Sequence, residues 1–168
     1  MKKKVFMSII AIFVAMSILF SEGAAVEAAS KITNFGKYNL SLTSIKKFSK
    51  KMGLKKAKNK NYSYFVKNKN TTVGYNKNYN TYDRSYGKYR LFVKNSSSKV
   101  SLWGIRPGMK RSDCRKKYKG HIWGVVEKTS RYDCVPFGFE HGGDVYFYYK
   151  NGKLQYWDLH VWYSDARW

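Results

Sequence analysis

The sequence predicts an α+β protein of one or two units, each a short helix packed on an antiparallel β-sheet, after a cleaved signal peptide. Three observations support this fold class. Two short segments place apolar residues at helical spacing, and several others alternate apolar with polar residues. An Asn-Gly pair separates the last two alternating segments, as in a hairpin. With 18% aromatic residues and two prolines, the chain has the composition of a folded domain.

The first residues are organised like a secretory signal peptide. Three lysines at positions 2–4 precede an apolar run, and a stretch of small residues follows it. Val26 and Ala28 fit the small residues that signal peptidase requires, which predicts cleavage after Ala28. An uncleaved membrane anchor is the alternative, but the apolar run falls short of the roughly 20 residues of a membrane span.

The predicted boundaries follow from this segment and from the change in composition along the rest of the chain. We divide the chain into a signal peptide over 1–28, a basic unit over 29–100 and a second unit over 101–168. The mature protein is expected to be exported, either secreted or held at the cell surface by its charge.

Positive charge is concentrated in the first of these two units. The whole chain has a net charge of +23, and Asp83 is the single acid among residues 29–100. Such an excess favours binding to a polyanion, with an affinity that falls as salt rises. For an exported protein the candidates are an anionic cell-wall polymer, an acidic lipid surface, extracellular DNA or an acidic polysaccharide. The alternative is that the charge serves solubility or retention near an anionic surface.

The first predicted helix carries much of this charge. A hydroxyl side chain at position 41, 43 or 44 supplies its N-cap, Ile45, Phe48 and Met52 form one apolar stripe, and Gly53 ends it. The stripe can pack on the sheet of the protein or lie on a membrane. The lysines off the stripe and in the loop after it are the predicted polyanion-binding residues: Lys46, Lys47, Lys50, Lys51, Lys55, Lys56, Lys58 and Lys60.

Alternating segments follow this helix and predict short strands over 61–68, 71–76, 89–95 and 99–105. The second unit then repeats the order of a helix followed by strands. Ser112 or Asp113 is expected to cap its helix, Cys114 and Tyr118 to face inward, and Gly120 to end it. Strands are predicted over 121–128 and 131–139.

A hairpin closes the second unit. Its turn is Asn151-Gly152, the type I′ signal, and a two-residue turn pairs Tyr146 with Trp157. Both faces of this hairpin are rich in aromatic residues, so one of them is a candidate recognition surface. The predicted partner-binding residues are Tyr146, Tyr148, Trp157 and Trp162.

The segment "LWGIRPGMKRSDCRKKYKG" and the later "VYFYYKNGKLQYWDL" resemble the repeat unit of the β-lactamase-inhibitor-protein-like superfamily, which includes the SmpA/OmlA lipoprotein domains. The resemblance covers about residues 100–163, and residues 40–103 are a candidate degenerate copy without the Gly-Met turn. It implies protein-protein binding, sometimes hydrolase inhibition, through an aromatic concave sheet face. No catalytic residue carries over. The matching residues are Ile105, Gly108, Met109, Gly120, Phe147, Asn151, Gly152, Lys153 and Leu154.

Two cysteines, Cys114 and Cys134, leave two interpretations open. An exported chain can bridge them in a disulfide, which would stabilise it by roughly 3 kcal/mol. Alternatively, both are small buried thiols that never meet.

Catalytic motifs are missing from the sequence: it has no HExxH, no CxxC pair, no phosphate-binding glycine loop and no nucleophile elbow. Acidic and histidine residues near the C-terminus could still converge, with Asp158 and His160 on one strand face and His141 nearby. We expect a secreted, non-catalytic binding protein that needs no cofactor or metal. The alternatives are an inhibitor of an extracellular hydrolase and a small secreted hydrolase that uses Asp158, His160 and His141.

Overall fold

A computed structural model describes residues 32–77, 79, 89–138 and 142–162, and the chain is α+β, as the sequence predicts. The predicted signal peptide lies outside these residues. The helices are η1 (Phe35–Lys37), α2 (Leu42–Lys51), α3 (Arg111–Tyr118) and η2 (Lys119–His121). The strands are β1 (Thr33–Asn34), β2 (Lys55–Lys56), β3 (Tyr64–Lys67), β4 (Thr71–Tyr75), β5 (Leu91–Asn95), β6 (Val100–Ser101), β7 (Glu127–Lys128), β8 (Tyr132–Phe137), β9 (Gly143–Lys150) and β10 (Lys153–Val161).

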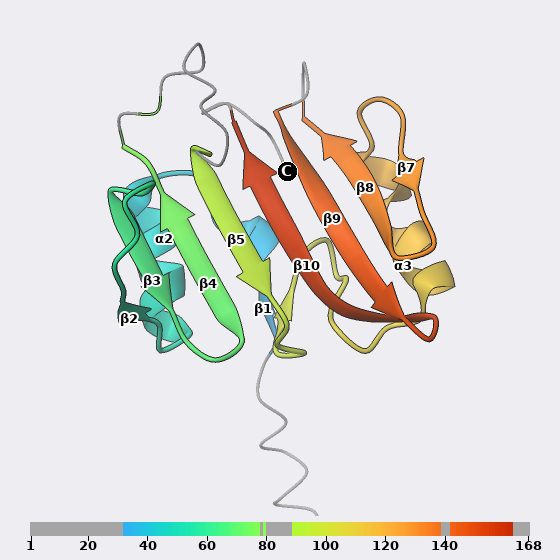
Figure 1. Ribbon diagram of the computed structural model, residues 1–168, viewed down its shortest axis with the longest axis horizontal. Coiled ribbons are helices and arrows are strands. Elements are labelled where there is room, and N and C mark those ends of the chain that lie inside the picture. The colour runs from blue at the N-terminus through green and yellow to red at the C-terminus, as the bar shows by residue number, and fades with distance from the viewer. Residues whose placement is uncertain (1–31, 78, 80–88, 139–141, 163–168) are drawn as a thin grey trace, which may run out of the picture. The chain divides into compact units, whose positions relative to one another are not determined.

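Eight of the strands form one antiparallel sheet in the order β2-β3-β4-β5-β10-β9-β8-β7. Each half of the chain therefore contributes one helix followed by four strands, and the last strands of the two halves, β5 and β10, pair at the centre. Figure 1 shows α2 and α3 behind this sheet, on the same face. The opposite face, toward the viewer, is called the open face below. Strands β1 and β6 form a separate parallel pair.

The core lies between the sheet and its helices. Phe35 from η1 packs edge-on against Phe48 of α2 with ring centroids 4.8 Å apart, and lies 6.2 Å from Trp157 of β10. In the second half, Tyr118 of α3 stacks on Phe147 of β9 at 5.7 Å. Both halves of the chain thus bury their apolar residues against one continuous sheet. No helix of the described residues is both long enough and apolar enough to cross a membrane.

The local signals of the first predicted helix are confirmed. The Ser41 hydroxyl accepts a hydrogen bond from the Ser44 amide at 3.2 Å and so caps α2. Ile45 and Phe48 are fully buried, and Gly53 follows the helix with a φ of +62°. The segment over 99–105 differs from its prediction, because its strand is limited to β6 and leaves the main sheet.

The start of α3 differs from the prediction. Its N-cap residue is Lys110, which makes no side-chain capping bond, rather than Ser112 or Asp113. The Arg111 amide instead donates to the carbonyl of Gly152 in the hairpin turn at 2.9 Å. A backbone carbonyl from the hairpin thus accepts a hydrogen bond from the first turn of the helix, where a capping side chain usually does so. Cys114 and Tyr118 face inward as predicted.

A buried ion cluster holds α3 against β8. The fully buried Asp133 carboxylate accepts hydrogen bonds from Arg111 at 2.7 Å and from Arg115 at 3.0 and 3.1 Å. The Tyr118 hydroxyl donates to the same carboxylate at 3.2 Å. Burial alone raises the pKa of Asp133, but the two guanidinium groups outweigh it and hold that pKa below its ordinary value. Arg111 and Arg115 of α3 therefore turn toward the sheet.

The closing hairpin forms at Asn151 and Gly152, whose φ angles of +51° and +69° are those of a type I′ turn. Beyond the first pairs its register differs from the prediction. Tyr156 pairs with Tyr148 and Trp157 with Phe147, because the register shifts between Leu154 and Tyr156. Gln155 is the extra residue of this β-bulge. The shift turns Trp157 into the core.

Candidate functional site

The predicted polyanion-binding lysines all lie on α2, on β2 and in the loop between β2 and β3. Every one of the eight is exposed. Within the parts of the chain that the structure describes, none lies within 4.0 Å of a carboxylate. Described residues before Asp113 include no acid at all. This group, called the lysine end below, consists of Lys46, Lys47, Lys50, Lys51, Lys55, Lys56, Lys58 and Lys60.

Charge is distributed unevenly over the two halves of the sheet, as it is along the sequence. Strands β2 to β5 form one half of the sheet, and β10 to β7 form the other. The five described acids, Asp113, Glu127, Asp133, Asp144 and Asp158, all belong to the second half. A polyanion that approaches the first half meets lysines, and none of the acids that the structure describes belongs to that half. Such an arrangement gives salt-sensitive attraction.

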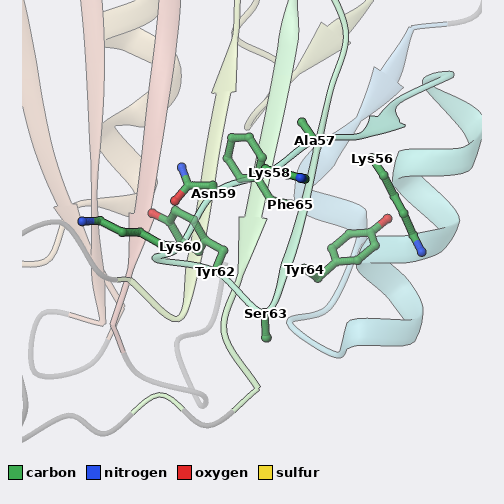
Figure 2. Close-up of a pocket in the computed structure, with 9 residues that line it drawn as sticks. All are labelled: Lys56, Ala57, Lys58, Asn59, Lys60, Tyr62, Ser63, Tyr64 and Phe65. Atoms are coloured by element: carbon green, nitrogen blue, oxygen red, sulfur yellow. The ribbon is translucent and has the colours of Figure 1, made fainter.

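A pocket of about 540 Å³ lies within the lysine end, beside the outer strands β2 and β3 (Figure 2). Figure 2 shows Lys56 and Tyr64 on the side next to α2, with Asn59, Lys60 and Tyr62 on the other side. Its lining residues are Lys56, Ala57, Lys58, Asn59, Lys60, Tyr62, Ser63, Tyr64 and Phe65. It is called the basic pocket below, and it combines three exposed ammonium groups with three aromatic rings.

Hydrogen bonds hold the loop that forms the basic pocket. The Ala57 amide donates to the Phe65 carbonyl at 3.1 Å, and the Asn61 amide donates to the Asn59 side chain at 2.9 Å. Just after β4, the Asn76 side-chain amide donates to the Asn61 carbonyl at 2.7 Å. The loop is therefore anchored at both ends and in the middle, which positions its lysines without ion pairs.

Five aromatic rings extend from the basic pocket across the open face. Tyr62 lies between Phe65 and Phe92, with ring centroids at 5.8 and 6.3 Å, and Tyr89 lies 6.4 Å from Phe92 and 4.3 Å from His160. Adjacent ring planes differ by at most 24°. Each ring is half-buried, so part of it contacts solvent. This set is called the ring row below.

Gly74 explains how the Tyr62 ring can lie flat on the sheet. Gly74 of β4 pairs with Phe65 on one side and with Phe92 on the other. A Cβ atom at Gly74 would lie 2.8 Å from three atoms of the Tyr62 ring. A glycine at this point of the strand therefore leaves the space that the ring occupies.

Beyond His160 the open face continues over the second half of the sheet. Tyr146 lies 5.3 Å from His160, and Tyr148 stacks on Tyr156 at 4.4 Å. The ring centroid of Tyr132 lies 5.7 Å from those of both Tyr146 and Tyr148. Tyr146 and Tyr148 therefore lie on one partly exposed aromatic face, and their role in partner binding stays a prediction.

The two tryptophans predicted to bind a partner lie on opposite faces of the sheet. Trp162 lies on the open face, 6.0 Å from Tyr89. Trp157 is fully buried on the helix side, so its assignment to the recognition surface is wrong. The bulge at Gln155 is the physical reason, since it reverses the faces that strict alternation assigns to the residues after it.

A lysine and a carboxylate lie at the centre of the open face. Lys94 of β5 places its Nζ 3.8 Å from Asp158 Oδ2 and 4.0 Å from the centroid of the Tyr156 ring. The other carboxylate oxygen of Asp158 is buried without a hydrogen-bond partner among the described residues. Burial raises the pKa of Asp158 to about 6, and Lys94 limits the rise. Burial also lowers the pKa of His160 to about 4, and nearby Lys94 adds to the fall.

The residues of the hydrolase alternative are brought together in part. Asp158 and His160 share the open face, as predicted, and Asp144 pairs with His160 across the strands. His141 lies outside the described residues. Within the described residues, no three His, Cys, Asp or Glu side chains are grouped so that they could hold a metal ion.

The two cysteines are free thiols on opposite faces of the sheet. Cys114 is buried between α3 and the sheet, whereas Cys134 pairs with Tyr146 and so faces the open side. Asp133, the neighbour of Cys134 in β8, points to the helix side. A disulfide between them is therefore excluded in this fold, because the bridge would have to pass through the sheet.

Sequence reasoning missed the ring row, although the alternation in "YSYFVK" and "RLFVK" was a signal for part of it. In both segments the residue between two core positions is a phenylalanine, Phe65 or Phe92, where a strand with a solvated face usually has a polar residue.

Comparisons with known proteins do not indicate a function, which must therefore be inferred from the fold and the site. No family model, no curated protein and no solved structure matches this chain.

Proposed function

We propose that this is an exported, non-catalytic binding protein that attaches to an anionic polymer or surface through its lysine end. The observation that carries the proposal is the clustering of eight exposed lysines on the half of the sheet where the described residues include no acid, and none of the eight pairs with a described carboxylate. Lys46 Nζ lies 6.0 Å from the centroid of the Tyr64 ring, but no described carboxylate neutralises any of these lysines. Their ammonium groups instead remain available to displace counterions from a polyanion.

We also infer that the two halves are copies of one unit of the β-lactamase-inhibitor-protein-like kind. Support comes from the order of elements, because α2 precedes β2 to β5 as α3 precedes β7 to β10. The symmetric sheet order, with the last strand of each half at the centre, also supports it. The helices then cover one face, as expected for such units.

A protein partner on the open face is the second candidate function, and inhibition of an extracellular hydrolase is one form of it. Tyr146, Tyr148 and Trp162 favour it, because half-buried Tyr and Trp side chains are enriched at binding hot spots. A stoichiometric enzyme bound to the protein purified from its native secretome would support the inhibitor form. The hydrolase alternative rests on Asp158 and His160, whose pKa values both favour the neutral form near pH 5.

The test of polyanion binding compares two variants with the same loss of charge. In one, Lys56, Lys58 and Lys60 of the basic pocket are changed to Gln; in the other, the exposed Lys116, Lys117 and Lys119 of the second half are changed to Gln. Binding to long-chain inorganic polyphosphate is measured across a salt series.

We expect the pocket variant to bind more weakly and to show the shallower dependence of log affinity on log salt, since the slope counts contacts with the anion. The matched variant should stay close to the wild type. Equal losses in both variants would mean that net charge, rather than the lysine end, is responsible.

A further inference from the structure

The ring row and the basic pocket share two residues, Tyr62 and Phe65, so the two features form one continuous surface. The pocket supplies cations at one end, and the rings extend from it over β4 and β5 to β10. Two further lysines lie along the same path. Lys67 follows Phe65 by two residues on β3, and Lys94 follows Phe92 by two residues on β5, so both side chains share the face of the rings.

We propose that this surface binds a single-stranded nucleic acid, with bases stacked on the ring row and phosphates on the lysines. The inference rests on the proposed function and names the class of polyanion. Proteins that bind single strands combine a positive groove along the backbone with aromatic rings that stack on successive bases. Here both parts occur side by side, and every residue of them except His160 belongs to the half of the sheet where the described residues include no acid.

The rings distinguish this ligand from the other polyanions. Polyphosphate and glycerol-phosphate polymers carry charge but no flat face, so they would leave the ring row unused. Paired bases in a duplex hide their faces from such a surface. Five half-exposed rings with adjacent planes within 24° of each other match a ligand that presents several planar groups in succession.

The acids of the open face mark the end of the proposed path. Asp144 pairs with His160, the last ring of the row, and Asp158 lies between His160 and the tyrosines of the second half. Phosphates would be repelled there. The backbone of the ligand is therefore placed along Lys58, Lys60 and Lys67 rather than over β9 and β8, and Lys94, which pairs with Asp158 at 3.8 Å, lies where this path ends.

The first test changes the ligand and leaves the protein intact. The full chain is titrated with fluorescein-labelled oligo(dT), with an abasic strand of the same length, with the corresponding duplex and with polyphosphate, and anisotropy is recorded. We expect oligo(dT) to bind about tenfold more tightly than the abasic strand, since each stacked base adds affinity. Equal affinity for these two strands would overturn the proposal while leaving polyanion binding in place. Failure of every polyanion to bind would instead reject the proposed function.

The second test changes the rings. A variant with Tyr62→Leu and Phe92→Leu is compared with a control with Tyr132→Leu and Tyr148→Leu, which removes two rings of the open face outside the row. The first should lose about tenfold in affinity for oligo(dT) and keep its salt dependence, while the control should bind as the wild type does. Circular dichroism and thermal unfolding confirm that both variants fold.

Three outcomes of the second test would count against a nucleic acid. If the control loses as much affinity as the ring-row variant, bases do not stack on this row. If the ring-row variant binds oligo(dT) normally, the rings are not used. If its loss appears with a sulfated or uronic-acid glycan and not with oligo(dT), the occupant is an acidic polysaccharide.

Discussion

Asp158 and His160 lie two residues apart on β10, on the same open face, and burial favours the neutral form of both. The pKa of Asp158 is raised to about 6 and that of His160 is lowered to about 4. The two shifts act on stability in opposite directions. Between about pH 4 and pH 6 the folded state keeps a proton on Asp158 that the unfolded state loses, so stability falls as pH rises. Over the same range the unfolded state protonates histidine and the folded state does not, so stability rises with pH.

Single substitutions should separate these two effects. Relative to the wild type, Asp158→Asn is expected to gain about 3 kcal/mol of unfolding free energy between pH 4 and pH 7, because it removes a shift of about two pKa units. His160→Gln is expected to gain unfolding free energy relative to the wild type as pH falls from 6.5 to 4, because only the wild type has a histidine that the unfolded state protonates first. Urea unfolding at several pH values measures both. Curves that run parallel to the wild type would show that burial does not shift these groups.

The Asp133 cluster should be the most sensitive polar site of the fold. Asp133→Asn leaves Arg111 and Arg115 facing a neutral, fully enclosed group, and removal of one partner from a buried ion pair costs about 3–5 kcal/mol. Asp113→Asn on the same helix makes no such change and should cost less than about 0.5 kcal/mol. Chemical denaturation at pH 7 compares the two. A small effect at Asp133 would mean that water solvates the two guanidinium groups about as favourably as the carboxylate does.

The same cluster predicts an acid dependence. Because the pKa of Asp133 lies below its ordinary value, its contribution is present at neutral pH and is lost as pH falls through that lowered pKa. Acid unfolding of the wild type should therefore begin below pH 4, and Asp133→Asn should remove this component of the pH dependence.

The bulge at Gln155 predicts that this residue can be deleted. Leu154 and Trp157 both face the core, and with Gln155 removed, Tyr156 alone would separate them, which restores strict alternation. Gln155 is exposed. Deletion should therefore cost less than about 1.5 kcal/mol, close to the cost of an ordinary substitution.

Deletion of Lys94 is the matched control, since it lies in the central strand β5 without a bulge. There a missing residue moves either Val93 or Asn95 to the wrong face, which should unfold the protein or cost several kcal/mol. Thermal unfolding of the two deletion variants gives the comparison. Similar losses in both would contradict the register of the hairpin.

Local chemistry made most of the elements predictable. Ser41 caps the helix it precedes, and Asn151-Gly152 closes the hairpin it interrupts, so neighbouring residues decide both. The start of α3 could not be read locally, because the carbonyl of Gly152, far along the chain, binds the Arg111 amide. The bulge also escaped prediction, since nothing in "KLQYWDL" distinguishes an extra residue from an alternating one.

Of the two parts of the candidate site, the lysine end could be predicted from the sequence and the ring row could not. Lysines off an apolar stripe are solvated wherever the helix packs, so their exposure followed from the sequence. The ring row gathers residues from the loop before β3, from the start of β5 and from β10. Their proximity depends on the pairing of β4 with β5 and of β5 with β10, and strand order across two halves of a chain is not encoded in local periodicity.

The two thiols should remain reduced and unreactive in the folded protein. Burial raises the pKa of both Cys114 and Cys134 to about 11, so little thiolate forms at pH 8, and the sheet separates them. Mass spectrometry after alkylation with a maleimide should find both cysteines unmodified under native conditions and both modified in guanidinium chloride. Because no bridge closes the intervening loop, a reductant should leave the melting temperature unchanged, whereas loss of a disulfide would cost roughly 3 kcal/mol. A fall in melting temperature with reductant, or a native mass two units below that of the dithiol, would show that the chain adopts a different arrangement of α3 and β8.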